Sequence, residues 1–569
     1  MHVGDSRRPA RYHRTMTRAP QSTFTPTPSS HRLDALDVLR GFALIGICVA
    51  NVEFFNRPVV ESGQGIPAGL HGLDRVVAFL VAYFVSGKFW TIFSLLFGMG
   101  FALMLERAQA AGRPFLPVYG RRIAVLLGFG LLHHSLLWSG DILISYAIGA
   151  MTLLLTLMAP PRALVAAFLL CAALTLYPGF GFAAWAFTPI LFAGAIALYL
   201  RAERGFWFAA LAVVPGALML LAAFVTAIGD GAADWPLAVA GLLLVALGLL
   251  AWRYRAPQIL RPLRAGVTIV MLTFALIALD GGMRYFAPDS AAADSASVTS
   301  TTSATSTTST STTSNTSNTS ASGETASAGQ TEEARYREQA ARSREEERVL
   351  TANSYPAAVA MRIRHLDERL RDEIGFSVLL LGVFLVGVWF VRSGVIAHAG
   401  DHLPLLRRLA WAGVPFGVGL GLLGSLISTG RPAGVDDHGY DFANALAMLG
   451  SLPAALGYIA AVLLMLHSRG VLAQVRVLAP FGRMALTNYL AQSLVFALLF
   501  YGHGLGWWGI ARTTQVGIAL LLCAVQIGLS HWWLARFQYG PAEWLWRALT
   551  YLTWPRMRAS SAASAAPPR

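Results

Sequence analysis

Apolar runs of about eighteen residues or more recur along almost the whole of this 569-residue chain. A run of that length can cross the roughly 30 Å of hydrocarbon in a bilayer as a single helix. Hydrophobic residues make up 55% of the chain and charged residues only 13%, whereas a soluble domain has about 25% charged residues. The sequence therefore predicts an all-α, polytopic integral membrane protein and excludes a string of soluble domains.

Hydropathy predicts about fourteen transmembrane helices in two bundles, residues 37–285 and 375–555. Between the bundles, residues 286–374 are first Ser/Thr-rich and then charged, and the tails 1–36 and 556–569 are polar and expected to be disordered. The predicted helices cover residues 37–55, 75–105, 121–138, 141–158, 163–178, 184–200, 206–228, 235–252, 265–283, 376–391, 409–429, 442–466, 484–501 and 513–534.

The basic residues of the chain predict its topology. The net charge is +14 and Lys88 is the only lysine, so arginine supplies almost all of the positive charge. The arginines concentrate in alternate loops between apolar runs, as the positive-inside rule requires of cytoplasmic loops. We therefore expect both termini in the cytoplasm and residues 286–374 on the other side of the membrane. Nucleic-acid binding, the usual meaning of such a charge in a soluble protein, is not expected here.

The charged segment at residues 331–372 carries glutamate and arginine at helical i, i+4 spacings. Two interpretations are open for it. A solvated tether that joins the two bundles is the one we expect. A helix that docks onto the rest of the protein outside the membrane is the alternative.

Polar side chains inside apolar helices require a partner or a function, because a central charge costs about 2.5–3.5 kcal/mol in hydrocarbon. In the first helix, Asp37 and Arg40 are spaced to pair, and Asn51 follows Arg40 eleven residues later on nearly the same face. Arg40 is either a topology anchor or a phosphate ligand, since a guanidinium suits that anion. Lys88 is deep enough in the second run to need a partner, and Gly98 there favours close helix packing.

The segment LLHHSLLWSGDILISYA contains the clearest candidate for proton chemistry. His133 and Asp141 are eight residues apart, so a helix or helical turn aligns them. A carboxylate that accepts a hydrogen bond from imidazole orients it as a general base. A structural polar pair is the alternative. A metal site is not predicted, because no third ligand follows at a characteristic spacing.

A polar stripe marks the segment PFGRMALTNYLAQS near the C-terminus, where Arg483 begins a helix. Asn488 and Gln492 lie one turn apart in an otherwise apolar span, next to Tyr489. Such a stripe either joins two helices or lines a substrate path. Further on, FQYGPAEWLWRALTY has the aromatic residues of a membrane-interface anchor.

These segments together resemble the YeiB-like family of bacterial inner-membrane proteins, domain-of-unknown-function family 418. GRMALTNYLAQS and FQYGPAEWLWRALTY resemble its most specific signatures, and LDVLRGFALIG, GKFWTIFSLLFGMGF and HHSLLWSGDILISYA match it in the same order. The family is similar in its first helix to the transmembrane acyltransferases. Arg40 matches the arginine of the acyltransferase-three pattern, whereas Asn51 stands where that pattern has histidine.

The resemblance implies a multi-pass inner-membrane acyltransferase that moves an acyl group from cytoplasmic acyl-CoA to an envelope glycan or lipid-linked acceptor. The residues expected to act in catalysis are His133, Asp141 and Lys88. The residues expected to bind acyl-CoA are Asp37, Arg40, Asn51 and Arg483. The residues expected along the acceptor path are Asn488, Tyr489 and Gln492. A small-molecule or ion transporter with Lys88, His133 and Asp141 as a proton relay is the alternative function.

Overall fold

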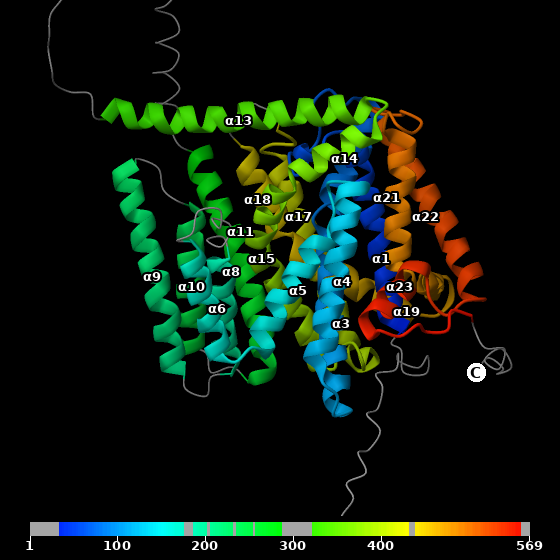
Figure 1. The fold of residues 1–569 in the computed structure, drawn as a ribbon, viewed down its shortest axis with the longest axis horizontal. Coiled ribbons are helices and arrows are strands. Elements are labelled where there is room, and N and C mark those ends of the chain that lie inside the picture. The colour runs from blue at the N-terminus through cyan, green and yellow to red at the C-terminus, as the bar shows by residue number, and fades with distance from the viewer. Residues whose placement is uncertain are drawn as a thin grey trace, which may run out of the picture. The chain divides into compact units, whose positions relative to one another are not determined.

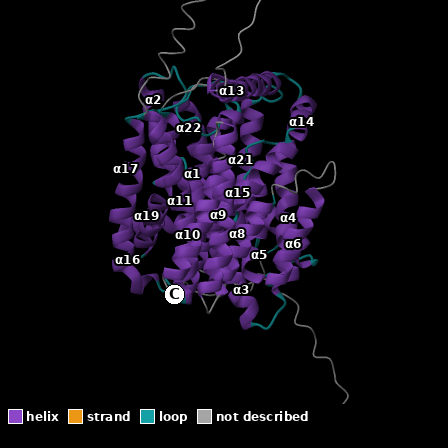
Figure 2. Ribbon diagram, turned by 90° about the vertical axis from the view of Figure 1, so that its left-hand side faces the viewer, coloured by secondary structure: helices purple, strands orange, loops and turns teal. Residues whose placement is uncertain are grey.

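The structure, a computed structural model, describes residues 34–175, 186–201, 205–230, 235–253, 257–286, 321–431 and 439–558. Throughout these ranges the named elements are helices (Figures 1 and 2). The predicted all-α class is therefore confirmed. The first 33 and last 11 residues lie outside the described ranges, and so do residues 287–320 of the Ser/Thr-rich tract. The disorder predicted for these segments stays a prediction.

Each of the predicted helices overlaps a helix in the structure, but the predicted number of spans is not confirmed. By length and composition, seven helices among the described residues are suited to cross a membrane, or eight if a pair bent by 77° counts as one. Other apolar helices, such as the one over Leu143–Met158, have fewer than the eighteen residues that this test requires. The helices of the first half are α1 (Asp34–Asn51), α2 (Gly72–Leu80), α3 (Lys88–Ala110), α4 (Phe115–Leu136), α5 (Leu143–Met158), α6 (Pro161–Thr175), α8 (Phe187–Arg201), α9 (Gly205–Asp230), α10 (Trp235–Arg253) and α11 (Arg261–Tyr285).

The second half begins with two polar helices and continues with apolar ones. The polar helices are α13 (Ala321–Thr351) and α14 (Tyr355–Arg364). The remaining helices are α15 (Leu366–Arg392), α16 (Leu403–Arg408), α17 (Val414–Ser425), α18 (Tyr440–Leu449), α19 (Ser451–Leu466), α20 (Leu478–Arg483), α21 (Ala485–Phe500), α22 (Arg512–Leu534) and α23 (Pro541–Tyr551). Short helical turns include η2 (Val52–Phe55), η3 (Val59–Glu61) and the π-helical η4 (Val81–Val85).

The helix α13 lies across one end of the other helices (Figure 1). We call this end, where α13, η3 and the connection from α4 to α5 meet, the capped end. The other end, which contains Arg40 at the start of α1 and Arg201 at the end of α8, is the arginine-rich end. There Arg201 donates to the Ala159 carbonyl, at 2.7 Å. These two loops, both predicted to be cytoplasmic, thus meet at the same end.

Helices from the two predicted bundles are interleaved. The α15 helix of the second half packs against α3, α5 and α11 of the first half, and α1 packs against α20 and α22. Glycine allows α3 and α15 to approach each other closely. A Cβ at Gly98 would lie 2.2 Å from the Phe384 carbonyl oxygen, and a Cβ at Gly387 would lie 2.2 Å from the Leu95 carbonyl oxygen. The two halves therefore share extensive contacts, which hydropathy does not predict because it locates helices but does not choose their neighbours, and the division into two bundles stays a prediction.

The charged segment docks onto the rest of the protein through its last turns. The Glu346 carboxylate of α13 accepts hydrogen bonds from the Val60 N–H and the Ser139 hydroxyl, each at 3.2 Å. Ser343 donates to Glu61 of η3 at 2.5 Å. On α14, Met361 is buried. These contacts favour the docking alternative over the solvated tether, and the tether interpretation failed because sequence periodicity does not reveal which face meets a partner.

The contact between α3 and α15 predicts that Gly98→Ala destabilises the protein. The new methyl group would collide with the Phe384 carbonyl and push the two helices apart, and overpacking of this kind costs about 1–3 kcal/mol. Gly100→Ala is the matched control on the same helix, because its Cβ would meet only Arg40 Nη2, at 3.9 Å. Thermal unfolding in detergent should show a lowered midpoint for Gly98→Ala alone. An equal midpoint for both variants would contradict this account of the interface.

Candidate functional site

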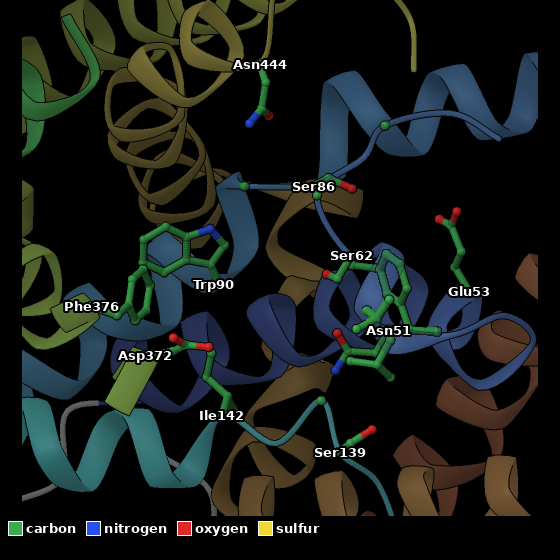
Figure 3. Close-up of a pocket in the computed structure, with 18 of the residues that line it drawn as sticks. Asn51, Glu53, Ser62, Ser86, Trp90, Ser139, Ile142, Asp372, Phe376 and Asn444 are labelled. Carbon is green, nitrogen blue, oxygen red and sulfur yellow. The ribbon is translucent and has the colours of Figure 1, made fainter. Parts of the chain in front are cut away.

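A cavity of about 1110 Å³ lies under α13 at the capped end. Its walls come from segments far apart in the sequence, namely the ends of α1 and α11, the connection from α4 to α5, the loop around η3, and parts of α13, α14, α15 and α18. Figure 3 shows side chains from several of these segments around one space, including Asn51, Asp372 and Asn444. This cavity is the candidate functional site.

One side of the cavity is apolar. Trp90 and Phe376 lie side by side in Figure 3, with ring centroids 5.6 Å apart. Tyr146, Phe274 and Ile277 extend the same side towards α5 and α11. This lining fits a hydrocarbon or the apolar face of a ring.

Ionisable groups also line the cavity, most of them from the charged segment. Its carboxylates are Glu53, Asp141, Glu345, Glu346, Glu368, Asp372 and Glu373. Its arginines are Arg342, Arg362 and Arg369. Arg342 pairs with Glu368, and Arg369 Nη2 lies 2.5 Å from Glu373 Oε1. Sequence reasoning missed these residues of α13, α14 and α15. The signal that could have indicated a docked segment was the presence of apolar residues among its charges. Leu350, Ala358 and Met361 are such residues, and they are buried.

The structure brings His133 and Asp141 together at the edge of this cavity. His133 Nδ1 and Asp141 Oδ1 are 2.7 Å apart, and both side chains are fully buried. The other carboxylate oxygen, Oδ2, accepts from the Ile144 N–H at 2.8 Å. Because a carboxylate only accepts, His133 Nδ1 carries the proton and Nε2 is left as the acceptor. His133 Nε2 makes no hydrogen bond to any described residue.

Only Asp141 of this pair lines the cavity, together with His134 and Ser145. The His133 ring lies behind it, with its centroid 5.1 Å from that of Tyr489. Arg369 donates to the Asp141 carbonyl oxygen at 2.8 Å, which ties α15 to this wall. The His133–Asp141 pair thus has the components of an oriented general base and lies next to a cavity that can hold a ligand.

Asn488 and Gln492 lie away from the cavity and join α21 to α22. Asn488 Nδ2 donates to Ser530 Oγ at 3.1 Å, and Gln492 Nε2 donates to Gln526 Oε1 at 2.9 Å. Gln526 in turn donates to the Asn488 carbonyl at 3.0 Å. Their contacts thus favour helix association, one of the two alternatives for this stripe.

Lys88 is the first residue of α3 and its side chain is fully buried. In the part of the chain that the structure describes, its Nζ has no hydrogen-bond partner. It does not line the cavity, although Gly87, Phe89 and Trp90 on either side of it do. The predicted need for a partner is thus not met by the described residues.

The residues predicted to bind acyl-CoA are divided between the two ends. Asn51 lines the cavity. At the arginine-rich end, Arg40 Nη1 lies 2.7 Å from Asp37 Oδ1, so the predicted pair is present. Arg40 does not line the cavity, because eleven residues of helix place it about 16 Å from Asn51 along the axis of α1. Arg483 ends α20, which packs against α1.

A second group of arginines accompanies Arg40. The charge of Arg122 interacts with those of Arg40 and Arg547. The Arg122 guanidinium also stacks on Trp546 of α23, 3.9 Å from the ring centroid. These arginines concentrate positive charge at this end.

The conspicuous C-terminal motif has a structural role. Glu543 of α23 accepts from the Leu486 and Thr487 N–H groups at 2.7 and 3.1 Å, and so caps the first turn of α21. Thr487 Oγ1 donates to the same carboxylate at 2.5 Å. The bend between α20 and α21 frees these N–H groups, and Glu543 supplies the acceptor that they need.

The fold and the cavity define a class: a helical, membrane-type protein with a large cavity of mixed polar and apolar lining near one end. Residues 390–553 match the family model described as Protein of unknown function (DUF418), and the predicted resemblance to that family is confirmed. No group of three or more possible metal ligands occurs among the described residues.

Curated relatives extend the similarity beyond that region. Uncharacterized protein YxaH of Bacillus subtilis is 25% identical over 539 residues, which are 94% of this chain and 98% of that protein. An uncharacterized 39.9 kDa protein in the amylase 3′ region of Bacillus acidopullulyticus is 39% identical over 122 residues, 21% of this chain and 33% of that protein. Uncharacterized protein YeiB of Escherichia coli is 44% identical over 73 residues, 13% and 19% of the two chains. No solved structure matches.

The position of Glu346 predicts a pH dependence for the docking of α13. Burial raises the pKa of this carboxyl above its usual range, against the opposing effects of its hydrogen bonds and of Arg362. A carboxyl with a raised pKa in the folded state stabilises docking at acidic pH, and this contribution is lost as the pH rises through that pKa. Hydrogen exchange of residues 338–351 should therefore become faster with rising pH, after correction for intrinsic rates.

Glu346→Gln should weaken this pH dependence, because the amide keeps an acceptor for Val60 or Ser139 and carries no charge. Glu347→Gln is the control one residue along α13, since Glu347 does not line the cavity. The same pH profile in wild type and Glu346→Gln would contradict the assignment.

Proposed function

We propose that the protein is a membrane-embedded acyltransferase that uses acyl-CoA as donor and a hydroxyl-bearing envelope glycan or lipid-linked molecule as acceptor. The observation that supports this function best is the buried His133–Asp141 pair behind the cavity wall. An imidazole oriented by a carboxylate is suited to take a proton from a group bound next to it. The cavity next to it offers the space for an acceptor.

In the proposed step, the acceptor oxygen attacks the thioester carbonyl carbon and its proton passes to His133 Nε2. The carbon–sulfur bond then breaks, and the leaving thiolate takes that proton from His133. The products are the acyl ester and CoA thiol, and the base is regenerated. Asp141 holds the tautomer and stabilises the imidazolium while the proton is on His133. His133 does not line the cavity and its Nδ1 side faces Asp141, so this step requires the wall to open and bring the acceptor to the Nε2 side of the ring.

The donor would bind by its phosphates at the arginine-rich end, where Arg40, Arg122 and Arg547 lie near one another. The thioester arm would run along α1 towards Asn51. We place this end in the cytoplasm of a bacterial cell, with the protein in the inner membrane and both termini inside. The bias of arginine to one end and the bacterial relatives support this orientation.

One specific observation favours the transporter alternative. A break at Ser86 and Gly87 interrupts the helical path from α2 to α3, where Gly87 has a φ of 77°. In the second half, Gly470–Arg483 and Ala485–Phe500 meet at an angle of 77°. Interrupted helices in both halves are typical of transporters with a central binding site. Binding of acyl-CoA separates the two functions, since a transporter of this kind has no use for it.

The donor site predicts that acetyl-CoA raises the thermal unfolding midpoint of the purified protein. Ligand at about a hundred times its dissociation constant adds roughly 2.7 kcal/mol of stability. Arg40→Ala should remove most of the shift. Arg162→Ala takes away an exposed arginine on α6 and should leave it unchanged. No shift with millimolar acetyl-CoA in the wild type would reject the acyltransferase and turn attention to transport.

The catalytic pair predicts that His133→Ala loses activity without losing its fold. A general base contributes about 10²–10⁴-fold, and acyl transfer to envelope material from labelled acetyl-CoA should fall by that factor. Asp141→Asn should also reduce the rate, because Nδ1–H loses its charged acceptor. His531→Ala changes an exposed histidine and serves as the control. Undiminished transfer by a well-folded His133→Ala would exclude the proposed role.

A further inference from the structure

The balance of charge around the cavity restricts what it can bind. Three arginines face seven carboxylates on its wall. Several of these carboxylates have arginine partners: Arg342 pairs with Glu368, Arg369 pairs with Glu373, and Arg512 Nη2, behind the wall, lies 2.9 Å from Glu53 Oε2. Paired charges leave no excess of positive potential for a phosphate. The site therefore differs from the arginine-rich end in the kind of ligand it suits.

Neutral donors and acceptors also face the cavity. Figure 3 shows the side chains of Asn51, Ser62, Ser86, Ser139 and Asn444 around the same space. Amides and hydroxyls both donate and accept, as the hydroxyl groups of a ligand do. A wall that combines them with more carboxylates than guanidinium groups offers hydrogen bonds to many hydroxyls and disfavours an anionic group.

Arg362 is a buried donor of the cavity wall, and its guanidinium lies over the Tyr501 ring, 5.5 Å from the ring centroid. Its side chain lines the cavity and is 2% exposed. Nη1 donates to the Leu136 carbonyl at 3.3 Å, whereas Nε and Nη2 make no hydrogen bond within the described ranges. The nearby charge of Glu346 compensates that of Arg362. A buried donor of this kind is costly unless a ligand satisfies it.

The apolar side of the cavity suits a hydrocarbon chain. Trp90, Phe376 and Phe274 line it, and Ile277 of α11 both lines the cavity and is 39% exposed. Ile277 also belongs to a span long and apolar enough to cross a membrane. A ligand with one polar and one apolar part would therefore meet matching surfaces at both.

We propose that the cavity binds an uncharged, hydroxyl-rich head group carried on an apolar chain, the chemistry of a glycolipid. That this ligand is the acceptor of acyl transfer rests on the proposed function. The assignment narrows the acceptor to a lipid-linked polyol that places no phosphate in the cavity. One hydroxyl would lie towards Asp141 and His133, and the others would bond the amides, carboxylates and Arg362. The chain would lie against the Trp90 side.

Binding to three lipids with the same acyl chains tests the assignment without any acyl donor. The full-length protein, purified in a detergent without sugar, is titrated with monoglucosyl diacylglycerol, diacylglycerol and phosphatidic acid, and bound lipid is counted by native mass spectrometry. We expect monoglucosyl diacylglycerol to bind at least ten-fold more tightly than either of the others. Equal affinity for diacylglycerol would overturn recognition of the head group, and tighter binding of phosphatidic acid would show an anion site.

Variants locate the binding. Arg362→Gln should weaken binding of the glucosyl lipid at least ten-fold. Arg371→Gln on α15 removes an arginine that does not line the cavity and whose partner, Asp367, does not line it either, so this variant should bind as the wild type does. Asn444→Ala, which alters the part of the wall on α18, should also weaken binding. This second variant keeps the test valid if Arg362→Gln fails to fold. Unchanged affinity in both cavity variants would overturn the proposal.

The two proposals fail in different experiments. Selective binding of the glucosyl lipid together with no acetyl-CoA shift would overturn acyl transfer and leave the ligand class standing. A clear acetyl-CoA shift without selective lipid binding would overturn the ligand class and leave acyl transfer standing.

Discussion

The carboxylate of Asp141 holds together the wall on which the cavity depends. One oxygen binds His133 at the end of α4, and the other binds the Ile144 N–H in the first turn of α5. The carbonyl of the same residue accepts from Arg369 of α15. A buried carboxylate is costly without such partners. The connection from α4 to α5 is therefore fixed relative to α15, and the groups of the cavity wall are fixed with it.

The same rule, that buried polar groups need partners within the protein, explains the irregular parts of the second half. The bend before α21 exposes backbone N–H groups that lipid cannot satisfy, and Glu543 supplies the acceptor from α23. Between α21 and α22, the Gln492 amide donates to the Gln526 side chain, which donates in turn to the backbone carbonyl of Asn488. The motifs that carry the family resemblance here are thus explained by packing, whereas the cavity is built largely from other segments.

The sequence predicted what depends on local pattern. Apolar runs located the helices, and the spacing of His133 and Asp141 predicted their pairing, because one helical turn and a short connection bring them together. The pattern did not predict that α15 packs between helices of the first half, since contacts such as Gly98 against Phe384 depend on which helices meet. Nor did it predict the role of α13 and α14. From the sequence alone, Glu346, Arg362 and Arg369 are expected to be solvated charges, because their partners come from loops distant in the chain.

The two ends of the molecule therefore differ in chemistry, and any function must connect them. Positive charge concentrates around Arg40, whereas the cavity beyond Asn51 has paired charges and an apolar side. Lys88 lies between these regions at the break after Ser86 and Gly87, two residues that line the cavity. A buried ammonium with no partner among the described residues is unfavourable. Because its neighbours Gly87, Phe89 and Trp90 line the cavity, Lys88 places a buried cation beside the space where the acceptor of an acyltransferase or the cargo of a transporter would bind.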